Sequence, residues 1–347
     1  MWRIITEDEL GGHLVDKLLR WDLALDGSWL ARYEEVAQKT QTLVNELDKV
    51  AELLSDKGIS VIALKNAGIV RAIYPNHACS PMGDIDLLVA KKDFKQAHNC
   101  LVSDLRYTFE FRSDLEEENL EEAFLDGGTE YFKDVGSIRV WLELQWRPIA
   151  GRWIQPHLEP DGDELIERSL PIEGSDARVL CPVDNLLQVC LHTAKHSYCR
   201  APGFRLHSDV DRIVRFSEID WSDFLTEVCK LHVQTAVYYS LLIPKVLLKT
   251  PIPDDIVQAL RPPGWKRRML EGLLDRAGLT NQTKKKFSRV GYIRFNLLLY
   301  DSFGDLLTGV FPSTAEMKKR YQFASNLLIP IYHIKRIYSL LFKRARL

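Results

Sequence analysis

The sequence predicts an α+β protein in which a small mixed β-sheet with flanking helices is followed by an all-helical part. Apolar residues recur at helical spacing through residues 31 to 57. Three later segments, 59 to 65, 84 to 90 and 136 to 148, read as strands, whereas from Pro182 onward the pattern is helical almost throughout. We therefore divide the chain into an N-terminal helical segment (1–58), a mixed α/β core (59–180) and a helical domain (181–347).

Composition limits the classes of function. The 347 residues are 46% hydrophobic, which is ample for a core, and the net charge of -2 gives no global attraction to nucleic acid or to an anionic membrane. The N-terminus lacks a signal-peptide pattern, and Pro or Lys interrupts the apolar runs, so we expect no membrane span. None of the six cysteines forms a CxxC pair. Reduced cysteines and a cytoplasmic location are expected.

The first elements follow from local signals. The helix over 31 to 57 is expected to end at Gly58, a typical residue after a helix C-terminus. The β-branched run ISVIALK (59 to 65) predicts a buried strand, and NAGIVRAIYPN predicts a turn and a short helix that Pro75 closes. DIDLLVA (84 to 90) is the second predicted strand.

After the second strand, the sequence predicts two helices, one further strand and then helices alone. Residues 93 to 105 and 115 to 124 predict helices, the second with a solvated acidic face. GSIRVWLELQWRP (136 to 148) is the third predicted strand, and no strand is expected after it. The first helices of the helical domain are expected at 183 to 199, 207 to 217 and 221 to 230.

Two aspartates one residue apart interrupt the apolar run PMGDIDLLV. Successive side chains of a strand point to opposite faces, so Asp84 and Asp86 share one face. Ionised carboxylates this close repel each other unless water or a cation neutralises them. The stretch therefore indicates a metal, although two hydrated aspartates at an exposed strand end are the alternative.

A third carboxylate can join this pair. Glu143 lies on one face of the third predicted strand, where it either converges with Asp84 and Asp86 or lies on the solvated face of an edge strand. Carboxylates on adjacent strands supply the oxygen ligands that Mg²⁺ prefers, and substrate phosphates complete its octahedron. Two such ions, about 3.5–4 Å apart, can activate an attacking hydroxyl and neutralise a leaving pyrophosphate.

Several of these segments resemble one known family. LKNAGIVRAIYPNHACSPMGDIDLLV resembles the signature of a family of uncharacterised nucleotidyltransferases in the DNA polymerase β-like superfamily, which has an LKG turn, a YP and a gDIDLLV strand. LELQW (142 to 146) is similar to its third-carboxylate strand. LLQVCLHTAKHSYCR with HSDVDRIV (186 to 200, 207 to 214) resembles its helical segment, and GVFPSTAEMKKRY (309 to 321) is more weakly similar.

The resemblance implies a nucleotidyltransferase fold with Asp84, Asp86 and Glu143 as catalytic and metal-binding residues. It also implies that the turn at Lys65 and Asn66 approaches the nucleotide triphosphate. The chain departs from the family pattern where Asn66 replaces Gly, Ser80 replaces a frequent Arg, and Gln145 replaces a frequent His. Asn tolerates left-handed backbone geometry, which such a turn can require.

A histidine pair in the helical domain has two interpretations. His192 and His196 are four residues apart on one predicted helix face, a spacing that zinc sites use, but no third ligand is evident. A hydrogen-bonded pair in the core is the favoured interpretation. The resemblance also favours contact between the triphosphate and Lys195 or His196, so both count as nucleotide-binding candidates.

Other charged residues are expected on the surface. Arg205 and Asp209, four residues apart on a predicted helix, are expected to form a surface ion pair. The basic stretches at 265 to 268, 284 to 286 and 334 to 347 suit RNA or a membrane surface, but docking of a terminal helix with a solvated basic rim is favoured for the last.

We therefore expect Mg²⁺-dependent transfer of a nucleoside monophosphate from an NTP, with ATP as the first candidate. The acceptor would be a hydroxyl or phosphate on a small molecule, peptide or protein. Two alternatives stay open: a pseudoenzyme that binds nucleotide or acceptor without transfer, and an RNA-associated protein whose affinity falls steeply with salt.

Overall fold

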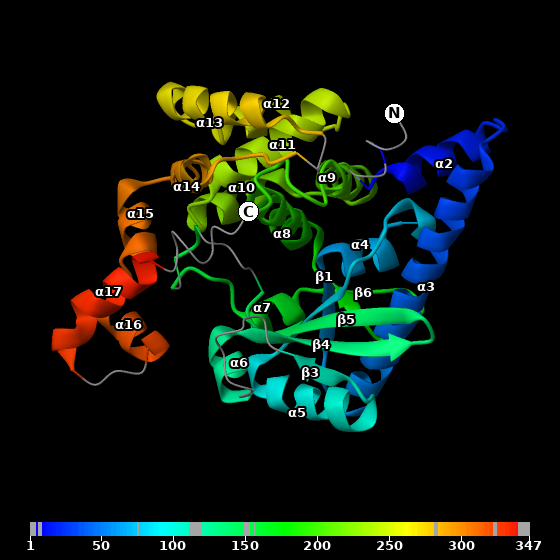
Figure 1. Cartoon of the computed structure of the whole chain (residues 1–347), viewed down its shortest axis with the longest axis horizontal. Coiled ribbons are helices and arrows are strands. Elements are labelled where there is room, and N and C mark those ends of the chain that lie inside the picture. Colours follow the sequence, from blue (N-terminus) through cyan, green and yellow to red (C-terminus); the bar gives the residue numbers. More distant parts are fainter. Residues whose placement is uncertain are drawn as a thin grey trace.

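A computed structural model describes residues 5, 9–74, 76–110, 120–148, 153–155, 157–280, 284–321 and 325–338. The predicted closing role of Pro75, the start of the helix predicted at 115 to 124, and residues 339 to 347 of the C-terminal basic stretch lie outside these residues. Figure 1 shows a sheet with its helices beside a mainly helical part, with helices α4 (Lys65–Ala72) and α8 (Pro182–Lys195) between the two.

The long N-terminal helix lies along one side of the sheet (Figure 1). Helix α2 (Gly11–Arg20) packs against α3 (Gly27–Asp56), whose first turn is capped by the Asp26 carboxylate accepting from the Ser28 N–H. Gly58 has a φ of 75° and follows the end of α3, as predicted. The apolar face of α3 is buried in the main core through Leu43, Leu47, Val50 and Leu54.

The sheet is mixed, and among the described residues it has seven strands in the order β3-β4-β5-β2-β1-β7-β6. The three strands that the sequence predicts form its centre, whereas the prediction that no strand follows residue 148 is wrong. Adjacent strands are antiparallel except for the parallel pairs β2 with β5 and β1 with β7. In chain order the strands are β1 (Val61–Leu64), β2 (Ile85–Val89), β3 (Thr108–Glu110), β4 (Gly128–Val135), β5 (Ile138–Gln145), β6 (Leu170–Pro171) and β7 (Arg178–Val179).

Short helices connect these strands. Helix α5 (Phe94–Asn99) continues into a π-helical turn over Cys100–Asp104, which together confirm the predicted helix at 93 to 105. Helix α6 (Leu120–Asp126) overlaps the helix predicted at 115 to 124, and α7 (Gly162–Glu167) precedes the two short strands β6 and β7.

The remainder of the chain is helical. Helix α10 (Trp221–Lys230) has the predicted bounds, and α8 ends four residues earlier than predicted. The division of the chain into three domains stays a prediction. The other helices are α9 (Arg205–Phe216), α11 (Gln234–Leu247), α12 (Asp254–Ala259), α13 (Gly264–Ala277), α14 (Arg289–Leu298), α15 (Phe303–Val310), α16 (Thr314–Tyr321) and α17 (Ile329–Tyr338).

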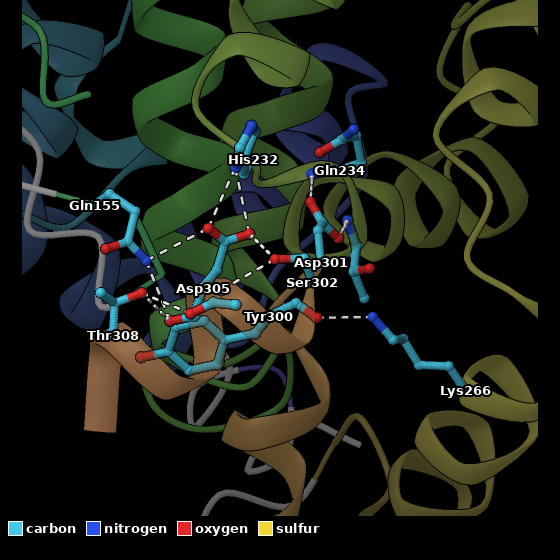
Figure 2. A network of polar contacts seen from close by, with 11 residues as sticks. Gln155, His232, Gln234, Lys266, Tyr300, Asp301, Ser302, Asp305 and Thr308 are labelled. Carbon is cyan, nitrogen blue, oxygen red and sulfur yellow. Dashed lines mark hydrogen bonds and ion pairs between the residues drawn. The ribbon is translucent and has the colours of Figure 1, made fainter. Parts of the chain in front are cut away.

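A polar network attaches the segment before α15 to the helices around it (Figure 2). Asp301 accepts hydrogen bonds from the backbone N–H groups of Gln234 and Thr235 at 2.5 and 2.9 Å, which caps the first turn of α11. Gln155 donates to the Asp305 carbonyl at 3.1 Å. Hydrogen bonds thereby connect α15 and the segment before it to the loop that follows β5 and to the start of α11.

Some of the basic residues belong to this framework. Lys266 is buried and donates to the Tyr300 carbonyl at 2.7 Å (Figure 2). Lys286 donates to the carbonyls of Gly278 and Thr280. Two of the basic stretches thus contribute lysines to helix connections, where an ammonium satisfies exposed carbonyl groups. Within the described residues, no helix combines the length and the apolar character needed to cross a membrane.

Candidate active site

The candidate site begins where β1 passes into α4. Lys65, the first residue of α4, has a φ of 49°, and its N–H donates to the Gln188 side chain at 3.1 Å. The left-handed residue of this turn is therefore Lys65 rather than Asn66. Helix α4 lies close to β1 because Gly68 has no side chain: a Cβ there would be 2.4 Å from the Ala63 carbonyl oxygen.

Three acidic residues stand in register across the sheet. Asp86 on β2 pairs with Glu143 on the parallel strand β5, and Glu143 pairs with Glu130 on β4. The Lys65 ammonium lies 2.5 Å from Asp86 Oδ1 and 3.4 Å from Glu143 Oε2. Asp86 and Glu143 are thus neighbours across β2 and β5, one of the two arrangements that the sequence left open for Glu143, and a lysine already neutralises part of their charge.

Asp84 comes directly before β2 and lines the same cavity as Asp86. The Asp84 residue is partly exposed to solvent. Desolvation of its carboxylate by the surrounding protein and, to a smaller extent, repulsion from the Asp86 carboxylate raise the pKa of Asp84 to about 6. Lys65 and Arg205 act in the opposite direction. Asp84 is therefore mostly ionised at pH 7, at an energetic cost that a bound cation would reduce.

The polar atoms of the Asn66 side chain form hydrogen bonds within the protein. Its amide Nδ2 donates to the Pro81 carbonyl at 2.8 Å, and its Oδ1 accepts from Ser80 Oγ at 3.0 Å. Both Asn66 and Ser80 are buried, although Asn66 also borders the cavity. The Asn66 side chain thereby links α4 to the segment that leads into the Asp84–Asp86 pair.

A cavity of about 240 Å³ lies between the start of α4, the segment from Gly83 to Asp86, and helices α8 and α9. His192 and His196 border it from α8 and the residue that caps α8. Their ring centroids are 4.7 Å apart. The two rings are therefore neighbours that both border the cavity, in keeping with their predicted spacing on one helix face.

Both histidines are neutral at pH 7. Burial, with a smaller effect of His196, lowers the pKa of His192 well below its usual value. Burial also lowers the pKa of His196 to about 4, although the ring's Nδ1–H donates to the Ala201 carbonyl. That hydrogen bond leaves Nε2 of His196 as the acceptor of the neutral ring.

The ion pair of Arg205 is buried rather than on the surface. The Arg205 guanidinium donates to Asp209 at 2.9 Å, as the spacing predicts, but both side chains are buried, at 8% and 3% exposure, so the expectation of a surface pair is wrong. Helix α9 packs against α4 and α8, which brings this pair inward. Glu9, from the N-terminal segment, accepts a second hydrogen bond from Arg205 at 2.6 Å.

The charges around the cavity do not balance. Four carboxylates border it, from Glu9, Asp84, Asp86 and Asp209, against the two cations Lys65 and Arg205, while both histidines are neutral. Lys65 pairs with Asp86, and Arg205 pairs with both Glu9 and Asp209, so these six side chains together carry a net charge of -2 when all four carboxylates are ionised. Excess negative charge in a partly enclosed site favours binding of a metal cation.

The donor set suits Mg²⁺ better than zinc. Within the described ranges, no group of three or more His, Cys, Asp or Glu side chains is arranged to hold a metal by itself. Mg²⁺ commonly takes one or two carboxylates and completes its coordination with water and substrate phosphates. Asp84 and Asp86 fit that pattern, whereas a structural zinc site needs four protein ligands.

Two candidate residues lie at the periphery. Glu143 is not among the residues that border the cavity, and it contacts the site through Lys65. Lys195, the last residue of α8, does not border the cavity either, but its charge contributes to the low pKa values of both histidines. Sequence reasoning missed Glu9, for which no motif gave a signal.

Comparison with known proteins agrees with the quoted signature. Residues 2–249 match the family described as "Uncharacterised nucleotidyltransferase". No curated protein matches the chain. Among solved structures, the chain is similar to an antigenic nucleotidyltransferase-like protein from Paracoccidioides brasiliensis, with 15% identity, a TM-score of 0.39, and coverage of 64% of this chain and 93% of that one. Since the family match spans well over half of the 347 residues, the chain belongs to this family of uncharacterised nucleotidyltransferases.

Proposed function

We propose that the protein is a Mg²⁺-dependent nucleotidyltransferase that moves a nucleoside monophosphate from an NTP, with ATP as the first candidate, to an acceptor. The acceptor group is a hydroxyl or phosphate on a small molecule, peptide or protein. The observation that carries the proposal is the position of Asp84 and Asp86 at one cavity with Lys65 and Arg205, in a chain of this family. Carboxylates for a metal and cations for phosphate are what transfer from a triphosphate needs.

In this reaction an acceptor oxygen attacks the α-phosphorus of the NTP, and the bond from that phosphorus to the β-phosphate oxygen breaks. Pyrophosphate leaves, and the proton of a hydroxyl acceptor passes to a carboxylate of the site. Asp84 and Asp86 would hold the Mg²⁺, which, when bound, neutralises phosphate charge and lowers the pKa of the attacking hydroxyl.

Glu143 and Lys65 have linked roles in this proposal. Lys65 contacts both Asp86 and Glu143, so Glu143 restricts where the Lys65 ammonium can lie. Asp86 would hold the metal, whose charge would repel the Lys65 ammonium, and Glu143 or a phosphate oxygen could then retain that ammonium. Glu143 is thereby proposed as the third carboxylate of the site, either as a ligand or as the proton acceptor.

The nucleotide-binding edge is proposed to use side chains more than the backbone. The Lys65 backbone N–H already donates to the Gln188 side chain, and the side-chain amide of Asn66 already donates to the Pro81 carbonyl. Lys65 and the neutral His196 border the cavity and can contact phosphate or sugar oxygens. Lys195, close to both histidines, is proposed to contribute charge at longer range.

A second candidate is a protein that binds nucleotide without transferring it. One observation favours it: the Lys65 ammonium lies between Asp86 and Glu143, where it neutralises carboxylates that a metal would otherwise use. Such a protein would bind nucleotide without releasing pyrophosphate.

The test uses each NTP labelled at either the α- or the γ-phosphate, with Mg²⁺ and a lysate of the host cells as the source of acceptors. Nucleotidyl transfer leaves the α-label on an acceptor and releases the γ-label with pyrophosphate. Transfer of the γ-label to an acceptor would instead indicate a kinase, and nucleotide binding without any transfer would support the second candidate.

A cytoplasmic location is part of the proposal. All six cysteines are described and none is in a disulfide, which suits a reducing compartment.

A further inference from the structure

We propose that Arg205 is a triphosphate-binding residue and that Glu9 is an internal anion which occupies its guanidinium until the triphosphate displaces it. This inference rests on the proposed nucleotide substrate, but it concerns residues that no family motif identified. It adds a specificity for polyphosphate and a competition between the N-terminal segment and the substrate.

The position of Arg205 suits an anion in the cavity. Arg205 borders the same cavity as Asp84 and Asp86, but it comes from α9 rather than from the β2 segment. Its guanidinium carries five N–H donors in a planar fork, which matches phosphate geometry. An arginine that shares a cavity with a carboxylate pair could bind phosphate oxygens that a metal on those carboxylates would leave free.

The two carboxylates that hold Arg205 differ in character. Asp209 is 3% exposed, lies four residues along the same helix, and also accepts a hydrogen bond from the Tyr74 hydroxyl at 3.2 Å. Glu9 is 37% exposed and lies 196 residues away in the sequence. Asp209 is therefore a fixed partner that orients the guanidinium, whereas Glu9 can leave without burying an unpaired charge.

Exchange of Glu9 for a triphosphate does not leave Arg205 without an anion. Glu9 itself lies in a backbone turn that the Leu10 N–H closes onto the Ile5 carbonyl at 2.9 Å, independently of its carboxylate. Replacing one carboxylate by a triphosphate, which carries more charge and more oxygens, keeps Arg205 paired throughout.

The competition is tested by calorimetric titration of the full chain with tripolyphosphate and with ATP plus Mg²⁺. Glu9→Gln removes the competing charge and should tighten binding of both probes about two- to fivefold, the range expected for one partly exposed ion pair. Arg205→Lys keeps a charge beside Asp209 but loses the fork, and should weaken binding about tenfold or more. In the double variant that combines Glu9→Gln with Arg205→Lys, the Glu9 substitution should tighten binding of the probes less than it does by itself, because the guanidinium that Glu9 pairs with is gone.

Arg215→Lys is the matched control. Arg215 lies on the same helix, pairs with Asp211 at 2.8 Å, and does not border the cavity. It should leave the affinity for tripolyphosphate unchanged, and a loss equal to that of Arg205→Lys would overturn the inference. Melting temperatures of all variants identify any loss of folding.

The outcomes separate the two proposals. Unchanged affinity in Glu9→Gln and Arg205→Lys, with pyrophosphate release intact, would overturn this inference and leave the function standing. The expected shifts with tripolyphosphate, in a protein that never releases pyrophosphate, would support the inference and contradict nucleotidyl transfer. Failure of the native chain to bind either probe would overturn both.

Discussion

Ser80 donates a hydrogen bond to Asn66 Oδ1 at 3.0 Å, so two of the positions where this chain departs from its family's pattern are in direct contact. Both side chains are buried, and Asn66 also donates to the Pro81 carbonyl. The two departures therefore act as one structural feature, which joins α4 to the segment carrying Asp84.

This contact predicts that substitutions at the two positions are coupled. Asn66→Gly alone leaves the buried Ser80 hydroxyl and Pro81 carbonyl without their partner and should destabilise the fold by about 1–3 kcal/mol. Ser80→Arg alone introduces a long charged side chain at a fully buried position and should be worse. In the double variant, removal of the Asn66 side chain makes room for the introduced guanidinium.

Urea unfolding of the two single variants and the double variant measures the coupling. We expect the double variant to be more stable than Ser80→Arg alone, with a coupling free energy of about 0.5–3 kcal/mol. Purely additive losses would show that the two positions do not act together.

Gly68 predicts a second effect on stability. In Gly68→Ala the new Cβ would lie 2.4 Å from the Ala63 carbonyl oxygen, so α4 must shift away from β1, at a cost of about 1–3 kcal/mol. Gly272→Ala is the matched control within another helix, where no atom lies within 4 Å of the new Cβ. The control should gain about 0.5–1 kcal/mol from better helix propensity.

The midpoint of urea unfolding distinguishes the two glycine variants. If Gly68→Ala proved as stable as Gly272→Ala, the close packing of α4 on β1 would be contradicted.

The raised pKa of Asp84 predicts a pH-dependent stability. A folded-state pKa of about 6, above the ordinary 3.8, means that the ionised form is disfavoured in the fold. This destabilisation is fully present above pH 6 and is lost as the pH falls from 6 toward 4. Without metal, Asp84→Asn should therefore raise the melting temperature at pH 8, and the gain should vanish near pH 4.

Asp134→Asn is a control of opposite sign. A hydrogen bond from Arg139 lowers the pKa of the exposed Asp134, which means that the ionised carboxylate is favoured in the fold. Removing that charge should therefore slightly lower the melting temperature at pH 8. Thermal melts in EDTA across this pH range are the measurement. A melting temperature of Asp84→Asn below that of the native chain at pH 8 would contradict the account of Asp84.

His196 predicts sensitivity to acid. Burial lowers the pKa of His196 from 6.5 to about 4, so the fold favours the neutral ring. The stability that depends on the neutral ring is present above pH 6.5 and is lost as the pH falls toward 4. His196→Gln retains an N–H for the Ala201 carbonyl but does not titrate, so its unfolding midpoint should fall less between pH 6.5 and 4.5.

Urea unfolding at several pH values checks this prediction. An equal fall in the native chain and in His196→Gln over that interval would show that His196 does not contribute to acid sensitivity.

The sequence predicted the central strands because their patterns are local. The runs at 59 to 65, 84 to 90 and 136 to 148 contain β1, β2 and β5, whereas the parallel register that brings Asp86 beside Glu143 is a pairing between distant segments. Strand β4 was missed because GTEYFKDV mixes charged residues with one glycine and lacks clear alternation. Strands β6 and β7 are two residues each, too short for any periodicity.

Among the residues that border the cavity, the sequence pointed to the aspartate pair, the turn at Lys65 and the histidines, but not to Arg205, Asp209 or Glu9. A motif marks Asp84 and Asp86, whereas Arg205 and Asp209 have the spacing of an ordinary surface ion pair. Their burial follows from the packing of α9 on α4 and α8, which is a tertiary contact. Glu9 reaches Arg205 across 196 residues, and no local pattern can predict such a pair.

Transfer of label from α-labelled ATP, measured in the presence of Mg²⁺ and lysate with the native chain, Asp86→Asn and Arg215→Lys, tests the central claim most directly. Asp86→Asn removes the charge of a proposed metal ligand while keeping the side chain's shape, and a melting-temperature measurement verifies that the variant folds. We predict label on an acceptor and matching pyrophosphate release with the native chain and Arg215→Lys, and a loss of at least about a hundredfold with folded Asp86→Asn. Transfer by Asp86→Asn at the native rate would contradict the assignment of the aspartate pair as the metal-binding centre of a nucleotidyltransferase.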